Sequence, residues 1–152
     1  MFAFLGPKRI EGLEGIDLVL EKENQADIHK GYVPSYDYAM VLHGTDTKVG
    51  GVCLRIGENT NIYFGGHIGY GVDQPHRGHG FAAKACRLLA PLARAHGMEE
   101  VVITCNPENI PSQRTCERLG AQLVNVVDLP EDNEMYLAGE RHKCRYIWCL
   151  KE

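Results

Sequence analysis

The chain has 152 residues, 44% of them apolar and 24% charged, and its formal net charge is −4. This composition excludes a disordered or collagen-like chain, and no apolar run approaches the roughly 20 residues that a membrane-spanning helix needs. The basic residues are scattered among acids, so we expect neither a nucleic-acid partner nor a membrane partner. The length is usual for one compact domain, and we expect a single domain over residues 1–152.

The cysteines and the first residues bear on the compartment. None of the six cysteines forms a C-x-x-C pair, and several fall inside predicted strands or helices, which favours reduced thiols over a disulfide framework. The first charges follow a very short apolar stretch, whereas a secretory signal places them before a longer one. We therefore expect a cytoplasmic protein.

The first half of the chain is predicted to be mostly strands. Alternation predicts a strand over residues 16–20, followed by a short helix or loop over 21–30. Pro34 indicates a surface loop, and its neighbours Tyr32 and Tyr36 are candidates to line a substrate site. Three antiparallel strands then form a meander, with turns near Gly44 and Gly57, at residues 38–42, 49–56 and 62–72.

In the second half, helices alternate with strands. Apolar residues recur at helical spacing from Phe81 to Leu92, Gly97 offers a C-terminal cap, and Pro91 predicts a bend. A second helix is predicted over residues 110–119, and strands over 101–105, 122–127 and 145–150. This order predicts an α/β fold whose mixed sheet is an antiparallel meander followed by alternating helices and strands.

Residues 68–83 carry the most informative pattern, a strand that runs into a glycine-containing turn and directly into a helix. The first amides of a helix have no intrahelical partner, and glycine lets the backbone approach a ligand closely. The chain has neither the Gly-Lys-Ser/Thr ending of a P-loop nor a complete GxGxxG at the first strand of a βαβ unit. The pattern favours a diphosphate site, although two glycines alone are compatible with a plain tight turn.

Arg77, Gly80 and Ala82 match the signature Q/R-x-x-G-x-G/A, and this stretch resembles the Gcn5-related N-acetyltransferases (GNAT). Residues 106–112 and 116–121 are similar to the family's second cofactor segment, an Asn-x-x-Ser turn into a helix that ends in Leu-Gly. The resemblance covers residues 49–127. The sequence pattern of residues 66–70 and 145–148 most resembles the branch of ribosomal-protein N-terminal acetyltransferases and their uncharacterised relatives.

The resemblance implies acetyl-CoA as co-substrate and no metal. It implies that backbone groups of residues 70–72 bind the pantetheine arm and polarise the thioester, and that residues 78–83 hold the pyrophosphate. The spacing of Asp73, His76 and His79 offers no helix or ribbon that would converge metal ligands. The implied cofactor-binding residues are Tyr70, Gly71, Val72, Arg77, Gly78, His79, Gly80, Phe81, Ala82, Ala83, Asn109 and Ser112.

The chain departs from the family pattern at the positions of the proton-transfer groups. Many relatives place a tyrosine seven residues after the asparagine as donor to the departing thiolate, and here that position is Cys116. We prefer Ser112 as the donor because a hydroxyl is a stronger hydrogen-bond donor than a thiol, although Ser112 also suits a helix cap and Cys116 a buried apolar position.

The usual position of the base is Thr104, which cannot act as one. Water-mediated loss of the proton stays open, and His67 is equally compatible with a hydrogen-bonded structural histidine. The candidate bases are His67, Asp73, Glu134 and Glu140.

We therefore expect an acetyl-CoA-dependent N-acetyltransferase in which a primary amine attacks directly in a ternary complex. The alternative is a catalytically silent acyl-CoA-binding regulatory module, and a structural domain without cofactor would leave the glycine turn unexplained. A peptide N-terminus, a polyamine, an aminoglycoside and an amino acid are all compatible acceptors. Both a monomer and a homodimer are compatible with the sequence.

Overall fold

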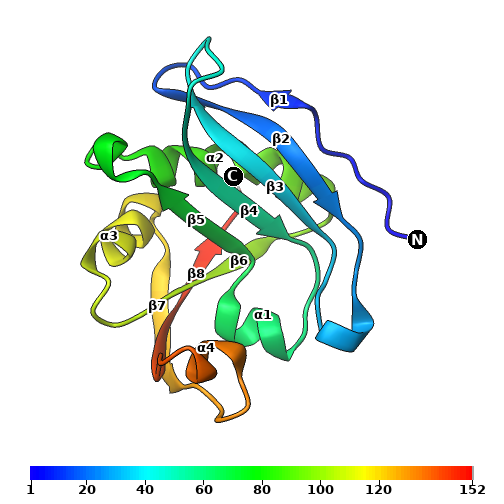
Figure 1. The fold of residues 1–152 in the computed structure, drawn as a ribbon, viewed down its shortest axis with the longest axis vertical. Helices are drawn as coiled ribbons and strands as arrows, with labels where there is room; N and C mark the ends of the chain where they lie inside the picture. Colours follow the sequence, from blue (N-terminus) through cyan, green and yellow to red (C-terminus); the bar gives the residue numbers. More distant parts are fainter. Residues whose placement is uncertain (152) are drawn as a thin grey trace.

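The structure is a computed structural model that describes residues 1–151. Two antiparallel sheets form the frame (Figure 1). The first has five strands in chain order: β1 (Arg9–Ile10), β2 (Ile16–Asn24), β3 (Ser35–Leu42), β4 (Lys48–Arg55) and β5 (Ile68–Val72). The second has the order β6-β8-β7, formed by β6 (Glu100–Cys105), β8 (His142–Cys149) and β7 (Gln122–Asp128).

The longest helix lies behind the first sheet in Figure 1. This helix, α2 (Phe81–Ala95), is amphipathic, buries Phe81, Leu89 and Leu92, and contacts β2, β4 and β5. It continues through Pro91, whose side chain is exposed; the bend expected there stays a prediction. None of the helices in residues 1–151 is long and apolar enough to cross a membrane.

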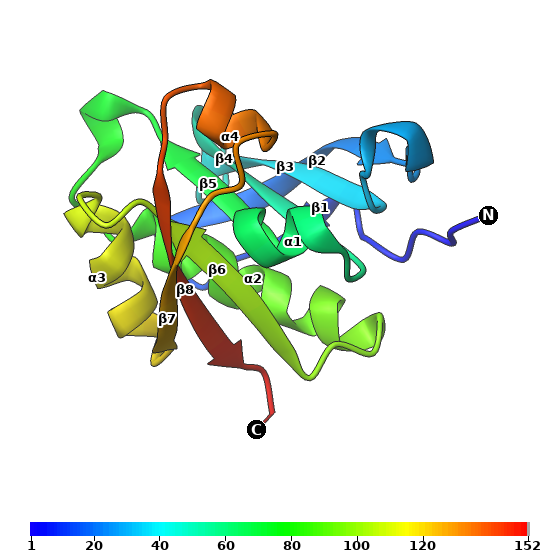
Figure 2. The same ribbon diagram turned by 90° about the horizontal axis from the view of Figure 1, so that it is seen from below.

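The remaining helices are short. The helix α3 (Ile110–Leu119) lies beside the second sheet, as Figure 2 shows from below. The other helical segments, all in connections between strands, are η1 (Ile28–Lys30), α1 (Thr60–Gly65), η2 (Gln74–His76) and α4 (Glu134–Leu137).

The two sheets meet where β5 and β6 begin. The His67 amide donates to Val102 O at 2.7 Å, and the Val102 amide donates to Nδ1 of the His67 ring at 2.9 Å. Gly66 makes this approach possible, because a Cβ at this position would lie 2.8 Å from Val102 O and its φ is +79°. Beyond this point the two strands belong to separate sheets, so a split opens between their C-terminal ends.

Several predicted elements are confirmed and others are wrong. The helix over residues 110–119 has the predicted bounds, and the meander and the alternating second half are present. The strand predicted over residues 62–72 is wrong in its first part, where Asn59 caps α1 instead. Residues 21–24 continue β2, so the short helix is confined to η1, and Tyr36 lies fully buried on β3 instead of in a surface loop.

One buried carboxylate ties the start of the chain to the β3–β4 turn. Asp17, 1% exposed, accepts hydrogen bonds from the amides of Gly12 and Gly44 and from the side chains of Arg9 and His43, at 2.7–2.9 Å. Burial acts to raise the pKa of Asp17, but these four donors outweigh it and hold the pKa far below its usual value. The carboxylate is therefore ionised at every ordinary pH and stabilises this corner of the sheet.

Candidate active site

The glycine turn after β5 presents unpaired backbone amides. Gly78 and Gly80 adopt φ values of +89° and +72°, a conformation that favours glycine. The first backbone hydrogen bond of α2 runs from Lys84 N to Gly80 O at 3.1 Å, so the amides of residues 81–83 have no partner within the helix. Together with the positive end of the helix dipole, they create an anion-binding site.

A groove of about 500 Å³ runs from this turn to the start of α3. Its cationic side chains include Arg77, which donates from Nε to Val72 O at 2.8 Å, and Arg118, whose Nη1 lies 3.5 Å from where a Cβ on Gly80 would be. The free amides and the guanidinium groups are both suited to bind a diphosphate. The groove is lined by Tyr70, Gly71, Val72, His76, Arg77, Gly78, Gly80, Phe81, Ala82, Asn109, Pro111, Ser112, Arg114, Thr115 and Arg118.

The start of α3 brings two hydroxyl groups together inside the groove. Asn109 is the N-cap, since its Oδ1 accepts from the Ser112 amide at 3.2 Å, which leaves the Ser112 hydroxyl free of a capping role. Ser112 Oγ lies 2.6 Å from the hydroxyl oxygen of Tyr70, which reaches across from β5. Burial raises the pKa of Tyr70, so the phenol keeps its proton and remains a donor.

Cys116 lies behind these hydroxyls. It is fully buried, close to the Tyr70 side chain. Burial raises the pKa of Cys116 to about 12, and neighbouring buried thiols such as Cys105 add to the effect. The thiol is therefore neutral and does not line the groove.

His67 holds the two sheets together with both ring nitrogens. Because Nδ1 accepts from the Val102 amide, the proton is on Nε2, which donates to Glu58 Oε1 at 2.8 Å and to Gly57 O at 3.1 Å. The side chain is 2% exposed and does not line the groove. Both ring nitrogens are occupied by hydrogen bonds within the protein, which favours the structural role over that of a base, the two alternatives that the sequence left open for His67.

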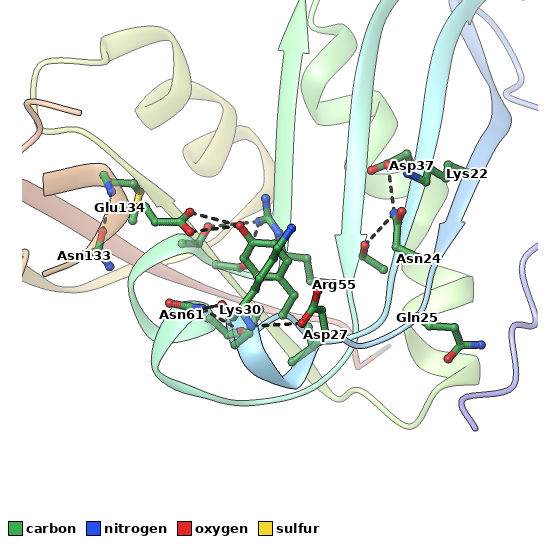
Figure 3. A pocket seen from close by; sticks show the side chains of 18 residues that line it. Lys22, Asn24, Gln25, Asp27, Lys30, Asp37, Arg55, Asn61, Asn133 and Glu134 are labelled. Carbon is green, nitrogen blue, oxygen red and sulfur yellow. Dashed lines mark hydrogen bonds between the residues drawn. The ribbon is translucent and has the colours of Figure 1, made fainter. Parts of the chain in front are cut away.

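A second pocket, of about 640 Å³, lies between η1, α1, α4 and the ends of β2 to β4 (Figure 3). Figure 3 shows Asp37 and Asn24 on its strand side and Glu134 on the opposite side, with Arg55 between them in this view. Glu134 accepts from the Tyr32 hydroxyl at 3.2 Å, and Asp37 Oδ2 accepts from Asn24 Nδ2 at 3.1 Å. Tyr32, a candidate from the sequence for lining a substrate site, is among the residues that line this pocket.

The outer face of the first sheet, opposite α2, connects the second pocket to the groove. A shallow trough there shares Asp37 and Arg55 with the second pocket and Tyr70 with the groove. Strand β5 carries only Gly69 and Gly71 on this face between Ile68 and Val72, and a Cβ on Gly71 would meet no atom within 4 Å. A ligand in the pocket can therefore reach the β5 backbone.

Most of the residues expected to bind the cofactor line the groove, but some residues of the groove and of the second pocket were not predicted from the sequence. Of the twelve expected cofactor residues, His79 and Ala83 are not among the lining: His79 is exposed and stacks on Phe81, and Ala83 is buried. Asp73 is exposed beside η2, and Glu140 pairs with Lys143 at 2.7 Å, which lowers the pKa of Glu140. No group of metal-binding side chains is present within the described chain.

The missed residues are the Tyr70 side chain, Arg114, Arg118, Asp37 and Arg55. The two arginines on α3 are four residues apart, a spacing that places them on one helix face and that was a usable signal. The positions of Asp37 and Arg55 follow from the register of β3 and β4, for which the sequence carried no such signal.

Solved structures of acetyltransferases share this fold. A putative ribosomal-protein-serine acetyltransferase from Vibrio cholerae has a TM-score of 0.66, with 16% identity, over 93% of this chain and 97% of that one. A probable GNAT-family acetyltransferase from Chromobacterium violaceum has a TM-score of 0.69, with 13% identity, over 97% and 89%. The ribosomal-protein-S5-alanine acetyltransferase from Vibrio fischeri has a TM-score of 0.61, with 16% identity, and this chain covers 63% of it from 78% of its own length.

At the level of sequence, no curated protein matches the chain. The profile of the Acetyltransferase (GNAT) domain matches residues 14–122, which is more than half of the chain. The matched range includes β5, the glycine turn, α2 and α3, the elements that build the groove. The chain therefore belongs to the GNAT family of acetyltransferases, whose acetyl donor is acetyl-CoA.

Proposed function

We propose that the protein transfers the acetyl group of acetyl-CoA to a primary amine, which attacks directly while both substrates are bound. The observation that carries the proposal is the groove between β5 and the starts of α2 and α3, where the first amides of α2, Arg77 and Arg118 lie near the Tyr70 and Ser112 hydroxyls. Acetyl-CoA supplies the activated thioester carbonyl.

The residues of the groove suit the two ends of the donor. The free amides at the start of α2 and the guanidinium groups of Arg77 and Arg118 would hold the pyrophosphate, with charge-assisted hydrogen bonds. Backbone groups of residues 70–72 line the groove at the open edge of β5 and would hold the pantetheine arm. Asn109 lines the same wall while capping α3.

Two hydroxyl groups are suited to protonate the departing thiolate. Ser112 and Tyr70 both line the groove and are hydrogen-bonded to each other, so one can donate while the other orients it. Cys116 does not line the groove, so its thiol is not placed to reach the departing sulfur. We therefore assign the donation to Ser112, supported by Tyr70.

The second pocket supplies the carboxylates for the acceptor. Glu134 and Asp37 line it from α4 and β3, and we propose that the amine loses its proton there, through water, before it attacks. His67 has no part in this step because both of its ring nitrogens are hydrogen-bonded within the protein.

The biological setting is part of the same proposal. A small amine or a peptide N-terminus is the acceptor, and the protein acts as a monomer or a homodimer. All six cysteines are free thiols, four of them buried, which supports a reducing compartment such as the cytoplasm.

Two measurements test the function. Calorimetry should show one acetyl-CoA site, with far weaker binding of adenosine, which lacks the diphosphate; equal affinities would contradict the assignment of the groove. A panel of amines with free-thiol detection should then reveal turnover. Binding without turnover of any amine would identify a catalytically silent acyl-CoA-binding module instead.

A further inference from the structure

We propose that the acceptor is a small amine that also carries a carboxylate, as a free amino acid does, and that Arg55 binds this carboxylate. The inference rests on the proposed function, because it names the acceptor of the same transfer. It concerns the second pocket and the trough on the outer face of the first sheet.

The charges around the second pocket balance. Three acids line it, and three bases line it as well: Asp27, Asp37, Glu134, Lys22, Lys30 and Arg55. A polyamine or an aminoglycoside, with several positive charges, would meet the three cations as well as the carboxylates. A ligand that carries one charge of each sign matches the lining better.

Arg55 is the cation whose surroundings call for an anion. It is half-buried, and its Nη1 donates to the carbonyl oxygens of Gly66 at 3.1 Å and Gly65 at 3.4 Å, at the end of α1. A guanidinium has five N–H donors, so most of them are left for a ligand. Within residues 1–151, no carboxylate forms an ion pair with Arg55.

The position of Arg55 sets the distance between the carboxylate and the amine. A Cβ on Gly69 would lie 3.3 Å from Arg55 Nη2, so the guanidinium lies over β5 immediately before residues 70–72. Gly71 is two residues further, about 7 Å along a strand, and its outer face is open. A ligand whose carboxylate is bound to Arg55 can therefore bring its amine to the edge of the split between β5 and β6. For this, the amine must be separated from the carboxylate by one carbon, as in an α-amino acid.

Asp37 completes the site for such a ligand. In the register of β3 and β4 it lies opposite Cys53, on the same face as Arg55 and diagonal to it. Both side chains line the pocket and the trough. The carboxylate of Asp37 attracts the ammonium form of the incoming amine, while Arg55 fixes the other end, so the two side chains orient a zwitterion.

The test compares L-phenylalanine with L-phenylalaninamide as acceptors, together with putrescine. The amide has the less basic amine, so a larger fraction of it is unprotonated and able to attack near neutral pH. A preference for the acid therefore reports on binding. We expect kcat/KM to be at least about 10-fold higher for the acid, and Arg55→Gln to lower it by about 10- to 100-fold for the acid only, the range of a lost charged hydrogen bond.

Control variants separate recognition from folding. Arg55→Lys keeps the charge and should retain part of the preference, whereas Lys8→Gln, which removes an exposed cation that lines neither pocket nor the trough, should not change it. A structural role alone for Arg55 would lower the rates of acid and amide together, which overturns the proposal. An equal or better rate with the amide or putrescine overturns it as well while the proposed function stands. Turnover of no amine, with acetyl-CoA bound, overturns both.

Discussion

The assignment of the glycine turn predicts a loss of acetyl-CoA affinity that is separate from any loss of stability. Gly80 and Gly97 have nearly the same φ, +72° and +82°, so a leucine at either position meets the same backbone strain. Left-handed helical geometry costs an L-residue about 1–2 kcal/mol, which should lower Tm by about 2–8 °C in a chain of this size. The two variants therefore form a matched pair.

Their positions differ in what the new side chain meets. At Gly80 the Cβ points toward Arg118 across the groove, at 3.5 Å from Nη1, where the diphosphate is expected. At Gly97, after the end of α2, it meets no atom within 4 Å and lies outside the groove. Displacing even one charge-assisted hydrogen bond to the phosphates costs about 1.5–3 kcal/mol, so Gly80→Leu should weaken binding by about 10- to 150-fold or more.

Calorimetry with acetyl-CoA at fixed salt, beside urea unfolding of both variants, measures the two effects independently. Gly97→Leu should lose stability and keep its affinity, and Gly80→Leu should lose both. Equal acetyl-CoA affinities of Gly80→Leu and Gly97→Leu would refute the assignment of the glycine turn, and so would losses of affinity in proportion to stability in both variants.

Three further outcomes are expected. Ser112→Ala should lower kcat by about 100-fold with little change in acetyl-CoA affinity, and Tyr70→Phe should also lower kcat. Cys116→Ala should lower mainly Tm. Steady-state kinetics in which Cys116→Ala loses turnover and Ser112→Ala does not would make the thiol the proton donor. Arg118→Met should weaken acetyl-CoA binding and make it less dependent on salt, which titrations at two ionic strengths will show. Because the folded pKa of Asp17 is depressed, its contribution to stability is present above the unfolded value near 3.8 and is lost as the pH falls below it. Unfolding curves from pH 7 to 2 should therefore show acid destabilisation that is weaker in Asp17→Asn, itself less stable at pH 7 by about 3–5 kcal/mol.

Local patterns in the sequence predicted the elements whose own residues determine them. The helix over residues 110–119 was placed correctly because a cap, a proline in the first turn and a glycine after the last residue lie within one short stretch. The strand over residues 62–72 failed because apolar content alone does not distinguish a short helix from a strand. Asn59, which caps α1, and the Gly65-Gly66 pair were the signals that marked the break.

The acceptor side of the site was beyond local patterns. Asp37 and Arg55 are 18 residues apart in the sequence, and only the register of β3 and β4 places them on one face. A shift of one residue in that register would move one of them to the core face. The role of His67 was open for the same reason, since its partner Val102 comes from the other sheet.

The proton donor illustrates how one substitution changes the role of a distant residue. A tyrosine at the position of Cys116, as many relatives of the family carry, would place an aromatic ring on this part of the helix face. Here the position holds a small buried thiol, and the Tyr70 side chain from β5 lies close to it, with its hydroxyl 2.6 Å from Ser112 Oγ. A phenol is thus retained beside the groove, although it arrives from a strand and not from α3. A tyrosine at position 116 on α3 would compete for space with the Tyr70 ring from β5, so we expect Cys116→Tyr to displace that ring and lower the folding stability. A double variant that also carries Tyr70→Ala should recover the stability that the single change loses. Stability that is not recovered in the double variant would show that the two rings do not compete for one space.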